Sequence, residues 1–262
     1  MKKILALVIA IAMILTCSLA LADRLADIKA AGKLSVATSP DWPPYEYIDD
    51  AGNVAGTDIK MVEYFAEQMG VELEIQQMSF DACLAAVATK KVDMAVAGLT
   101  YDEERTVSMD LIGVYWSEGD QGLLVRKGEG AAYATPESFA GKTVAAQNGT
   151  IQQNLVADQL ADANLELITK IPDGVNMLKA GRVDALAVPK TVYDSILAEN
   201  DDLEIAACVL AADGGNYVAV VKDEAALAAE VQKMIDTINA EGLYATWMDE
   251  VVANQNAEKA AE

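Results

Sequence analysis

The sequence predicts an α/β protein in which one chain forms two lobes joined by two hinge crossovers. Short β-rich runs alternate with amphipathic helical stretches through most of the 262 residues, and this order of elements occurs twice. Two polar, Gly-rich stretches separate the two sets of elements. Hydrophobic residues make up 53% of the chain, which is enough for two lobes that each bury a core.

The first set of elements opens on the run LSVAT (34–38), which predicts a strand. Apolar residues at helical spacing predict a helix over 58–69, with Thr57 as its N-cap and Gly70 as its end. The set continues with a strand, a helix and a strand over 71–77, 80–89 and 92–98.

The second set of elements repeats this order. It opens on the strand KTVAAQ (142–147), and a helix over 151–160 follows the loop NGT. It continues with a strand, a helix, a strand and a helix over 165–171, 175–180, 183–188 and 191–199.

The two crossovers are expected at VYWSEGDQG (114–122) and AADGGN (211–216). Beyond the second crossover, the strand YVAVV (217–221) and a helical tail from Ala225 would return the chain to the first lobe. Two connections between two lobes make a hinge. The predicted boundaries place the first lobe at 23–116 and 213–262, and the second lobe at 117–212.

The amino terminus predicts an export signal over residues 1–22. A lysine pair precedes an apolar run, and Ala20-Leu21-Ala22 supplies a small-x-small cleavage pattern. Two alternatives stay open: a lipid attached to Cys17, or an uncleaved anchor, since the apolar run nearly spans a bilayer. Each of the three places the domain outside the cytoplasm, in the periplasm or on the cell surface.

Charge and composition argue against several classes of function. The chain carries 19 Lys and Arg against 41 Asp and Glu, a net charge of −22, which repels nucleic acid and anionic lipid. It contains no histidine, the commonest metal ligand and general base, so neither a metal nor another cofactor is expected. Cys83 and Cys208 lie in apolar runs far apart in the sequence, which favours two buried free thiols over a disulfide.

A series of motifs occurs in a fixed order along the chain. The motifs are WPPYEY, GTDIKMVEYFAEQMG, FDACLAAVATKKVDMAVAGLTYDEER, AGKTVAAQNGTIQ and LKAGRVDALAV. In this order and spacing the sequence resembles the bacterial extracellular solute-binding proteins of family 3, the polar amino-acid receptors of ABC importers. The resemblance implies a periplasmic-binding-protein type II fold, in which a small-molecule ligand is clamped between the two lobes.

Arg105, in GLTYDEER, matches the arginine with which this family binds the α-carboxylate of its ligand. Asp102 can cap a short helix whose first turn contains Arg105, and a guanidinium there can bind a carboxylate through two hydrogen bonds. The preceding loop, with Ala97, Gly98 and Thr100, would add N–H groups and a hydroxyl. The alternative is a structural arginine that pairs with a neighbouring acid.

The second lobe offers the start of the helix at Ile151. Free N–H groups at a helix N-terminus bind anions, so Thr150, Ile151 and Gln152 could meet the same carboxylate from the opposite side. Alternatively, the GT pair is an ordinary turn with a helix cap.

Trp42 stands where the family places an aromatic ring against the ligand, although the ring could instead pack on the lobe surface. The expected ligand-binding set also includes Ser39 and Thr57.

Two residues depart from the family pattern. Thr57 stands where the family commonly has a second aromatic residue. Pro189 stands where the acid that binds the ligand's α-ammonium is expected, and proline offers neither a carboxylate nor an N–H. Either the ligand lacks the ammonium, or the alignment shifts locally, or another acid replaces the missing one. The candidate acids are Asp41, Glu118, Asp120 and Asp213.

The expected function is that of an extracytoplasmic receptor and not of an enzyme. It would capture an amino acid or a related small carboxylate between closing lobes and deliver it, as a monomer, to the membrane permease of an ABC importer. One alternative is an enzyme like the cyclohexadienyl dehydratases, which resemble this family and would need a proton donor in the cleft. The other is a sensory module that docks on a signalling partner instead of an importer.

Overall fold

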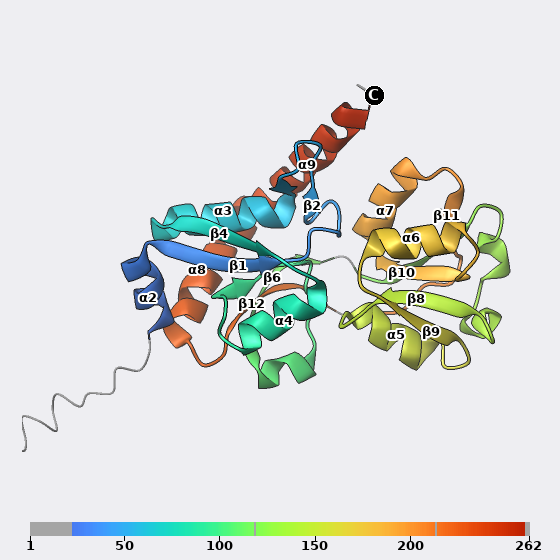
Figure 1. Cartoon of the computed structure of the whole chain (residues 1–262), viewed down its shortest axis with the longest axis horizontal. Helices are drawn as coiled ribbons and strands as arrows, with labels where there is room; N and C mark the ends of the chain where they lie inside the picture. Colours follow the sequence, from blue (N-terminus) through green and yellow to red (C-terminus); the bar gives the residue numbers. More distant parts are fainter. Residues whose placement is uncertain (1–22, 118, 213, 260–262) are drawn as a thin grey trace, which may run out of the picture.

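The structure, a computed structural model, describes residues 23–117, 119–212 and 214–259. Over these residues it has two α/β lobes that lie side by side (Figure 1), each with a five-stranded sheet between helices. The predicted α/β class with two lobes is confirmed. The expected export signal, including Cys17, lies outside the described residues.

The sheet of the first lobe has the strand order β4-β1-β5-β12-β6. β1 is parallel to β4 and β5, whereas β12 is antiparallel to β5 and β6. The strands are β1 (Lys33–Thr38), β4 (Glu72–Gln77), β5 (Met94–Ala95), β6 (Met109–Ser117) and β12 (Gly215–Val221). The helices are α2 (Arg24–Ala31), α3 (Thr57–Met69), α4 (Phe80–Ala88), α8 (Ala225–Glu241) and α9 (Leu243–Lys259). Shorter elements are the hairpin of β2 (Tyr47–Ile48) with β3 (Val54–Ala55) and the 3-10 helix η1 (Glu103–Val107).

Side chains along each strand of this lobe point alternately to the two faces of its sheet, so each strand contributes residues to both faces. Val36 and Val218 belong to the cluster that packs with α3 and α8 on one face. Their neighbours Ala37 and Ala219 point to the opposite face, where they pack with α4. The small alanine side chains allow α4 to lie close to the sheet, and the end of β1 and the start of α4 both face the second lobe.

The sheet of the second lobe has the strand order β11-β7-β10-β8-β9. Leu124 and Leu186 pack with α6 and α7, whereas Leu123 and Ala187 pack with α5 on the other face. The strands are β7 (Gln121–Arg126), β8 (Thr143–Gln147), β9 (Asn164–Ile168), β10 (Ala185–Pro189) and β11 (Leu203–Ile205). The helices are α5 (Ile151–Gln159), α6 (Ile171–Lys179) and α7 (Lys190–Glu199), with the 3-10 helices η2 (Gly130–Ala132) and η3 (Pro136–Phe139).

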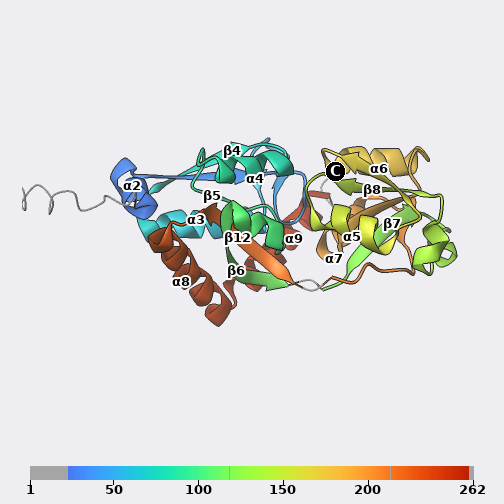
Figure 2. The same ribbon diagram turned by 90° about the horizontal axis from the view of Figure 1, so that it is seen from below.

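The chain passes between the lobes twice, and Figure 2 shows both connections. β6 ends in the first sheet at Ser117 and β7 begins in the second sheet at Gln121. β11 ends in the second sheet at Ile205 and β12 begins in the first at Gly215. The backbones of Gln121 and Leu210 exchange two hydrogen bonds of 2.9 Å, so the two connections are paired. Two paired connections between two lobes are the geometry of a hinge. The residues at which one lobe ends and the other begins stay a prediction.

The structure corrects the start of two helices. Gly56, and not Thr57, is the N-cap of α3. Its φ is +131°, and a Cβ at this position would lie 2.1 Å from the carbonyl oxygen of Tyr45, so only glycine fits. α6 begins at Ile171, a turn earlier than expected, because Pro172 stands in the first turn, where no backbone N–H is needed.

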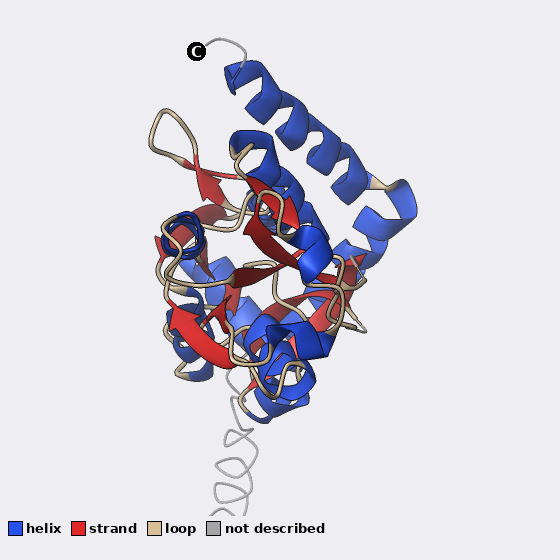
Figure 3. Ribbon diagram, turned by 90° about the vertical axis from the view of Figure 1, so that its right-hand side faces the viewer, coloured by secondary structure: helices blue, strands red, loops and turns tan. Residues whose placement is uncertain are grey.

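The last helix, α9, rises from the first lobe (Figures 1 and 3). Tyr244 and Met248 on its inner face are buried.

Cys83 and Cys208 are buried free thiols, as predicted. Within the described ranges, no helix has the length and apolar character needed to cross a membrane.

Candidate functional site

Two adjoining pockets lie at the junction of the lobes. Both are lined by Trp42, Gly98, Thr100 and Gln152, so they form two ends of one site. We call the first end the Arg105 pocket; its other lining residues are Phe80, Ala97, Arg105, Gln147, Thr150 and Ile151. We call the second end the amide pocket; its other lining residues are Tyr45, Gly119, Gln121, Pro189, Ala212, Gly214 and Asn216.

The structure brings most of the predicted site residues together in these pockets. They are Trp42, Ala97, Gly98, Thr100, Arg105, Thr150, Ile151 and Gln152. Ser39 lines neither pocket, and its hydroxyl donates to Asp41 Oδ1 at 2.7 Å. Thr57 also lies outside, fully buried, with its hydroxyl 3.3 Å from the carbonyl oxygen of Pro44. The first turn of α3 is therefore packed into the lobe and does not face the pockets.

Arg105 is held in place by the short helix η1, whose N-cap Asp102 accepts from the N–H of Glu104 at 2.9 Å. Only 7% of Arg105 is exposed. Its Nη1 donates to the carbonyl oxygen of Thr100 at 2.5 Å, and its Nη2 donates to that of Gly149, in the other lobe, at 2.8 Å. Burial lowers the pKa of Arg105, and among the described residues no carboxylate forms an ion pair with it. A buried cation of this kind is suited to bind an anion from solution.

The start of α5 lies across the Arg105 pocket from the arginine. Thr150 is its N-cap, with a hydroxyl that donates to the carbonyl oxygen of Gln147 at 2.7 Å and accepts from the N–H of Gln153 at 3.4 Å. The first N–H groups of a helix have no partner within the helix, and its N-terminus carries a partial positive charge. Arg105 and α5 therefore supply positive potential to one pocket from two lobes.

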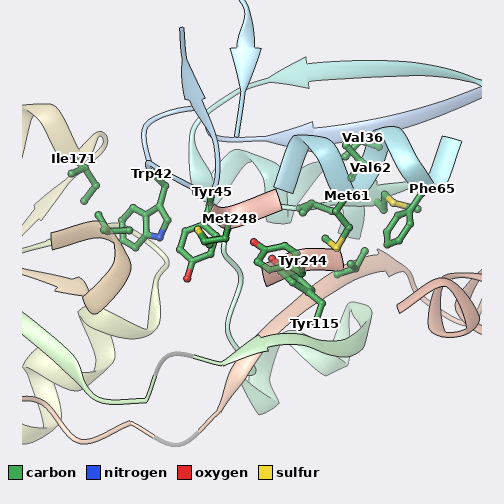
Figure 4. Packing of buried hydrophobic residues seen from close by; sticks show 14 of the residues in the cluster. Val36, Trp42, Tyr45, Met61, Val62, Phe65, Tyr115, Ile171, Tyr244 and Met248 are labelled. Carbon is green, nitrogen blue, oxygen red and sulfur yellow. The ribbon is translucent and has the colours of Figure 1, made fainter. Parts of the chain in front are cut away.

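Trp42 forms an aromatic wall shared by both pockets. Its ring lies between Tyr45 and Ile171 (Figure 4), and only 5% of the residue is exposed. Gly98 makes this position possible, because its φ is +54° and a Cβ there would lie 3.0 Å from Trp42 Cδ1. The N–H of Gly98 in turn donates to Asp58 Oδ2 at 2.9 Å.

Two buried carboxyl groups that the sequence reasoning missed lie behind this loop. Asp58 accepts from Gly98 and from the hydroxyls of Tyr115, at 2.9 Å, and Tyr244, at 2.6 Å. Glu46 is 1% exposed, and within the described part of the chain no N–H, hydroxyl or amide group donates to either of its oxygens; its side chain instead contacts the carboxyl group of Asp58. Burial first, and then the charge of Asp58, raise the pKa of Glu46 well above its ordinary value.

Direct hydrogen bonds join the two lobes around the site. Asp41, in the first lobe, accepts through Oδ2 from Gln147 Nε2 and from the N–H of Ile171, both at 2.9 Å and both in the second lobe. Burial raises the pKa of Asp41, while the bonds from Ser39, Ile171 and Gln147 and the charge of Lys170 oppose that shift. A more exposed bond of 3.2 Å runs from Asn148 to Asp81. The lobes are thus in direct contact at the end of β8 and the start of α6.

The amide pocket contains none of the acids described above. Gln152 Nε2 donates to Gln121 Oε1 at 2.7 Å, and Gln121 Nε2 donates to the carbonyl oxygen of Gly119 at 2.9 Å. Of the candidate replacements for the missing acid, Asp41 is occupied by the cross-lobe contact and Asp120 is exposed; neither lines a pocket. The other two candidates, Glu118 and Asp213, lie outside the described residues.

The pockets are narrow with the lobes in contact. Each has a cavity volume of about 10 Å³, which is the space of about one water molecule. A ligand as large as an amino acid therefore requires the lobes to move apart before it can enter.

The model of the family "Bacterial extracellular solute-binding proteins, family 3" matches residues 34–252. The chain belongs to this family. Among the curated relatives of this solute-binding protein is the arginine-binding extracellular protein ArtP of Bacillus subtilis, 29% identical over 73% of this chain and 75% of ArtP. Another is the L-cystine-binding protein TcyJ of Escherichia coli, 26% identical over 68% of this chain and 67% of TcyJ.

Solved structures resemble this solute-binding protein over most of its length. An amino acid ABC transporter substrate-binding protein from Streptococcus pneumoniae, bound to L-arginine, is 35% identical with a TM-score of 0.83. The similarity covers 87% of this chain and 97% of that one. The two-lobed architecture is therefore the type II periplasmic-binding-protein fold that the motifs implied.

Proposed function

We propose that this protein is an exported receptor that captures an amino acid or a related small carboxylate between its lobes. The observation that carries the proposal is the position of Arg105, a buried guanidinium without a carboxylate partner among the described residues, at the junction of the lobes. Arg105 donates two of its N–H groups to carbonyl oxygens. Its other N–H groups can therefore bind a carboxylate.

Closure follows from the same geometry. A carboxylate between Arg105 and the start of α5 would contact both lobes, and it would therefore stabilise the arrangement in which they touch. We place the ligand against Trp42, with Ala97, Gly98, Thr100, Thr150, Ile151 and Gln152 as further contacts. The hinge lies at the paired connections, which divide the chain near residues 116 and 212.

Delivery to an ABC importer is proposed from the relatives. The matched proteins are named as binding proteins for arginine, cystine or amino acids, and several are named as parts of ABC transporters. The partner we propose is the membrane permease of such an importer, and the receptor acts on the outer side of the membrane as a monomer. No described residue favours the dehydratase or sensory alternative over transport.

Replacing Arg105 tests the receptor function. The wild-type ligand is first identified by thermal-shift screening of the twenty amino acids with their keto and deaminated analogues, because a ligand that binds only the native state raises its stability. Arg105→Ala should then weaken binding of that ligand at least about thirtyfold, since loss of one partner of a buried charge pair costs about 2–5 kcal/mol. Isothermal calorimetry measures the change.

Arg182→Ala is the matched control, because it removes the same charge from an exposed position outside both pockets. This variant should bind with unchanged affinity. An Arg105→Ala protein that folds and binds as tightly as the control would remove Arg105 from the site and contradict the proposed function.

A further inference from the structure

The amide pocket is lined by uncharged polar groups. Gln121, Gln152 and Asn216 contribute side-chain amides, and Tyr45 contributes a fully buried hydroxyl without a hydrogen-bond partner among the described residues. Within the described part of the chain, neither carboxylate nor cation lines this pocket. Over the described residues the two ends of the site therefore differ: the Arg105 pocket is cationic, and the lining of the amide pocket carries no charge.

Hydrogen bonds fix the orientation of these amides. Gln121 Oε1 accepts from Gln152, and Gln121 Nε2 donates to Gly119, so the polar atoms of Gln121 are already paired. The side-chain oxygen of Gln152, Oε1, remains available to a ligand in the pocket. The side chain of Asn216, which is 6% exposed, forms no hydrogen bond within the described residues. Together with the hydroxyl of Tyr45, the described residues of this end offer hydrogen-bond donors and acceptors and no countercharge.

Pro189 is one of the residues that line the amide pocket. It lies directly opposite Gln121 in the antiparallel pair of β10 with β7, and it is the N-cap residue of α7. Proline contributes neither an ionisable group nor an N–H. A residue at this position is buried and faces the neighbouring amide, so its chemistry decides whether the pocket carries charge.

A buried ammonium group needs a countercharge, because the loss of its hydration is otherwise uncompensated. A hydroxyl or carbonyl group of similar size needs only hydrogen bonds, which amides and a phenol supply. We propose that the amide pocket binds an uncharged hydrogen-bonding group, so that the receptor takes 2-hydroxy or 2-oxo carboxylates at least as well as the corresponding amino acids. This inference rests on the proposed function, with the carboxylate at Arg105.

Matched pairs of ligands test the inference on the wild-type protein. The probes are L-arginine, L-leucine, L-phenylalanine and L-glutamate, each with its 2-hydroxy and 2-oxo analogue. For every pair that raises the melting temperature, calorimetry should give a dissociation constant for the hydroxy or oxo acid within about threefold of that of the amino acid, or below it. An amino acid that binds more than about tenfold tighter than both analogues would overturn the inference.

Pro189→Asp and Pro189→Asn are the decisive variants. Asp and Asn both suit the N-cap of α7, and they differ only in charge. Pro189→Asp should shift the preference towards the amino acid at least tenfold, about 1.4 kcal/mol, and Pro189→Asn should not. Equal preferences in the two variants would overturn the assignment of this pocket.

Two further outcomes separate this inference from the proposed function. If the wild-type protein prefers amino acids and loses that preference in Glu118→Gln or Asp213→Asn, an acid outside the described residues binds the ammonium and the inference is wrong, while the receptor function stands. If no ligand raises the melting temperature in the full screen of the twenty amino acids with their keto and deaminated analogues, the capture of small carboxylates is itself contradicted, and the inference with it.

Discussion

Glu46 and Asp58 are adjacent buried carboxyl groups, and burial raises the pKa of both, but only Asp58 receives hydrogen bonds that oppose the shift. Asp58 accepts three hydrogen bonds, from Gly98, Tyr115 and Tyr244, and two of these donors are the phenols visible in Figure 4. Such bonds stabilise a carboxylate. Glu46 has no comparable donors among the described residues, and it lies beside the negative charge of Asp58. We therefore expect Glu46 to be the carboxyl group that stays protonated in the folded protein.

This arrangement gives a pH dependence with a definite sign. The pKa of Glu46 is raised in the folded state above its ordinary value of 4.5, so between these two pKa values the folded protein binds more protons than the unfolded chain. The free energy of unfolding must then fall as the pH rises through this window. Below the ordinary pKa, both states are protonated and the penalty disappears.

We predict that Glu46→Gln removes this penalty, since an amide keeps the shape of the neutral acid and cannot ionise. As the pH rises above the ordinary pKa of 4.5, the stability of the wild-type protein should fall relative to that of the variant by up to about 1.4 kcal/mol per pH unit, until Glu46 ionises in the folded state. Urea unfolding at a series of pH values measures the difference. A constant difference between the two proteins across this range would contradict the raised pKa.

The sequence predicted the site residues that lie close to a local motif. Arg105 lies in the short helix η1, which Asp102 caps, and Thr150 caps α5, and such positions can be found from a short run of sequence. Ser39 was expected at the site, whereas the structure places it outside both pockets with its hydroxyl bonded to Asp41. Gln121 and Asn216 were missed because they become neighbours of the site only when the two crossovers are brought together, and no local pattern encodes that approach.

At the scale of elements, the start of α6 depends on a residue from the other lobe. Its N-cap residue, Lys170, makes no side-chain cap hydrogen bond. Instead, Asp41 accepts from the N–H of Ile171 and from Gln147, so one carboxylate binds both α6 and the end of β8. These bonds exist only while the lobes touch, because separation would leave both donors in water. Asp41 therefore stabilises the closed arrangement without lining either pocket.

We predict that Asp41→Ala weakens ligand binding about twofold to thirtyfold, because loss of an N-cap acceptor costs about 0.5–2 kcal/mol and the loss falls on the closed state. The change should be in the dissociation rate, which stopped-flow tryptophan fluorescence can follow through Trp42. Asp81→Ala, which removes the exposed cross-lobe contact with Asn148, is the control and should have a smaller effect. Equal effects in the two variants would rule out a special role for Asp41.

Most elements could be predicted from periodicity, but their ends could not. The amphipathic patterns of α3 and α5 were found within a residue or so of their true limits. The start of α3 was misplaced because the approach of the Tyr45 carbonyl, which requires Gly56, is a tertiary contact. β6 was not predicted as a strand, and its last residues, 114–117, were interpreted as crossover, although its pairing with β12 runs through Ser117.

At the scale of the whole molecule, the paired connections and narrow pockets require motion for ligand entry. We predict that a saturating ligand lowers the radius of gyration in solution scattering, because it adds contacts that exist only when the lobes are together. Arg105→Ala should show no such decrease at the same ligand concentration. A wild-type profile that ligand leaves unchanged would contradict hinge closure.

The two-lobed arrangement itself could be predicted from sequence, because each repeated set of elements encodes one lobe. The polar stretches over 114–122 and 211–216 also include residues through which the chain passes from one sheet to the other, while the boundaries of the lobes stay a prediction. The relative position of the lobes could not be predicted. It depends on a few hydrogen bonds between the lobes, such as the one that Arg105 donates to the carbonyl oxygen of Gly149. No sequence pattern links the residues that form these bonds.

The strand order of the first lobe sets the order in which the protein can assemble during its synthesis. β12 lies between β5 and β6, and within the described residues it is the strand that pairs with β6. Until residues 215–221 leave the ribosome, β6 has no partner in its sheet and α8 is not yet made to cover it. The second lobe is continuous and can fold as soon as β11 emerges. The lobe that begins the chain is therefore the last to be completed.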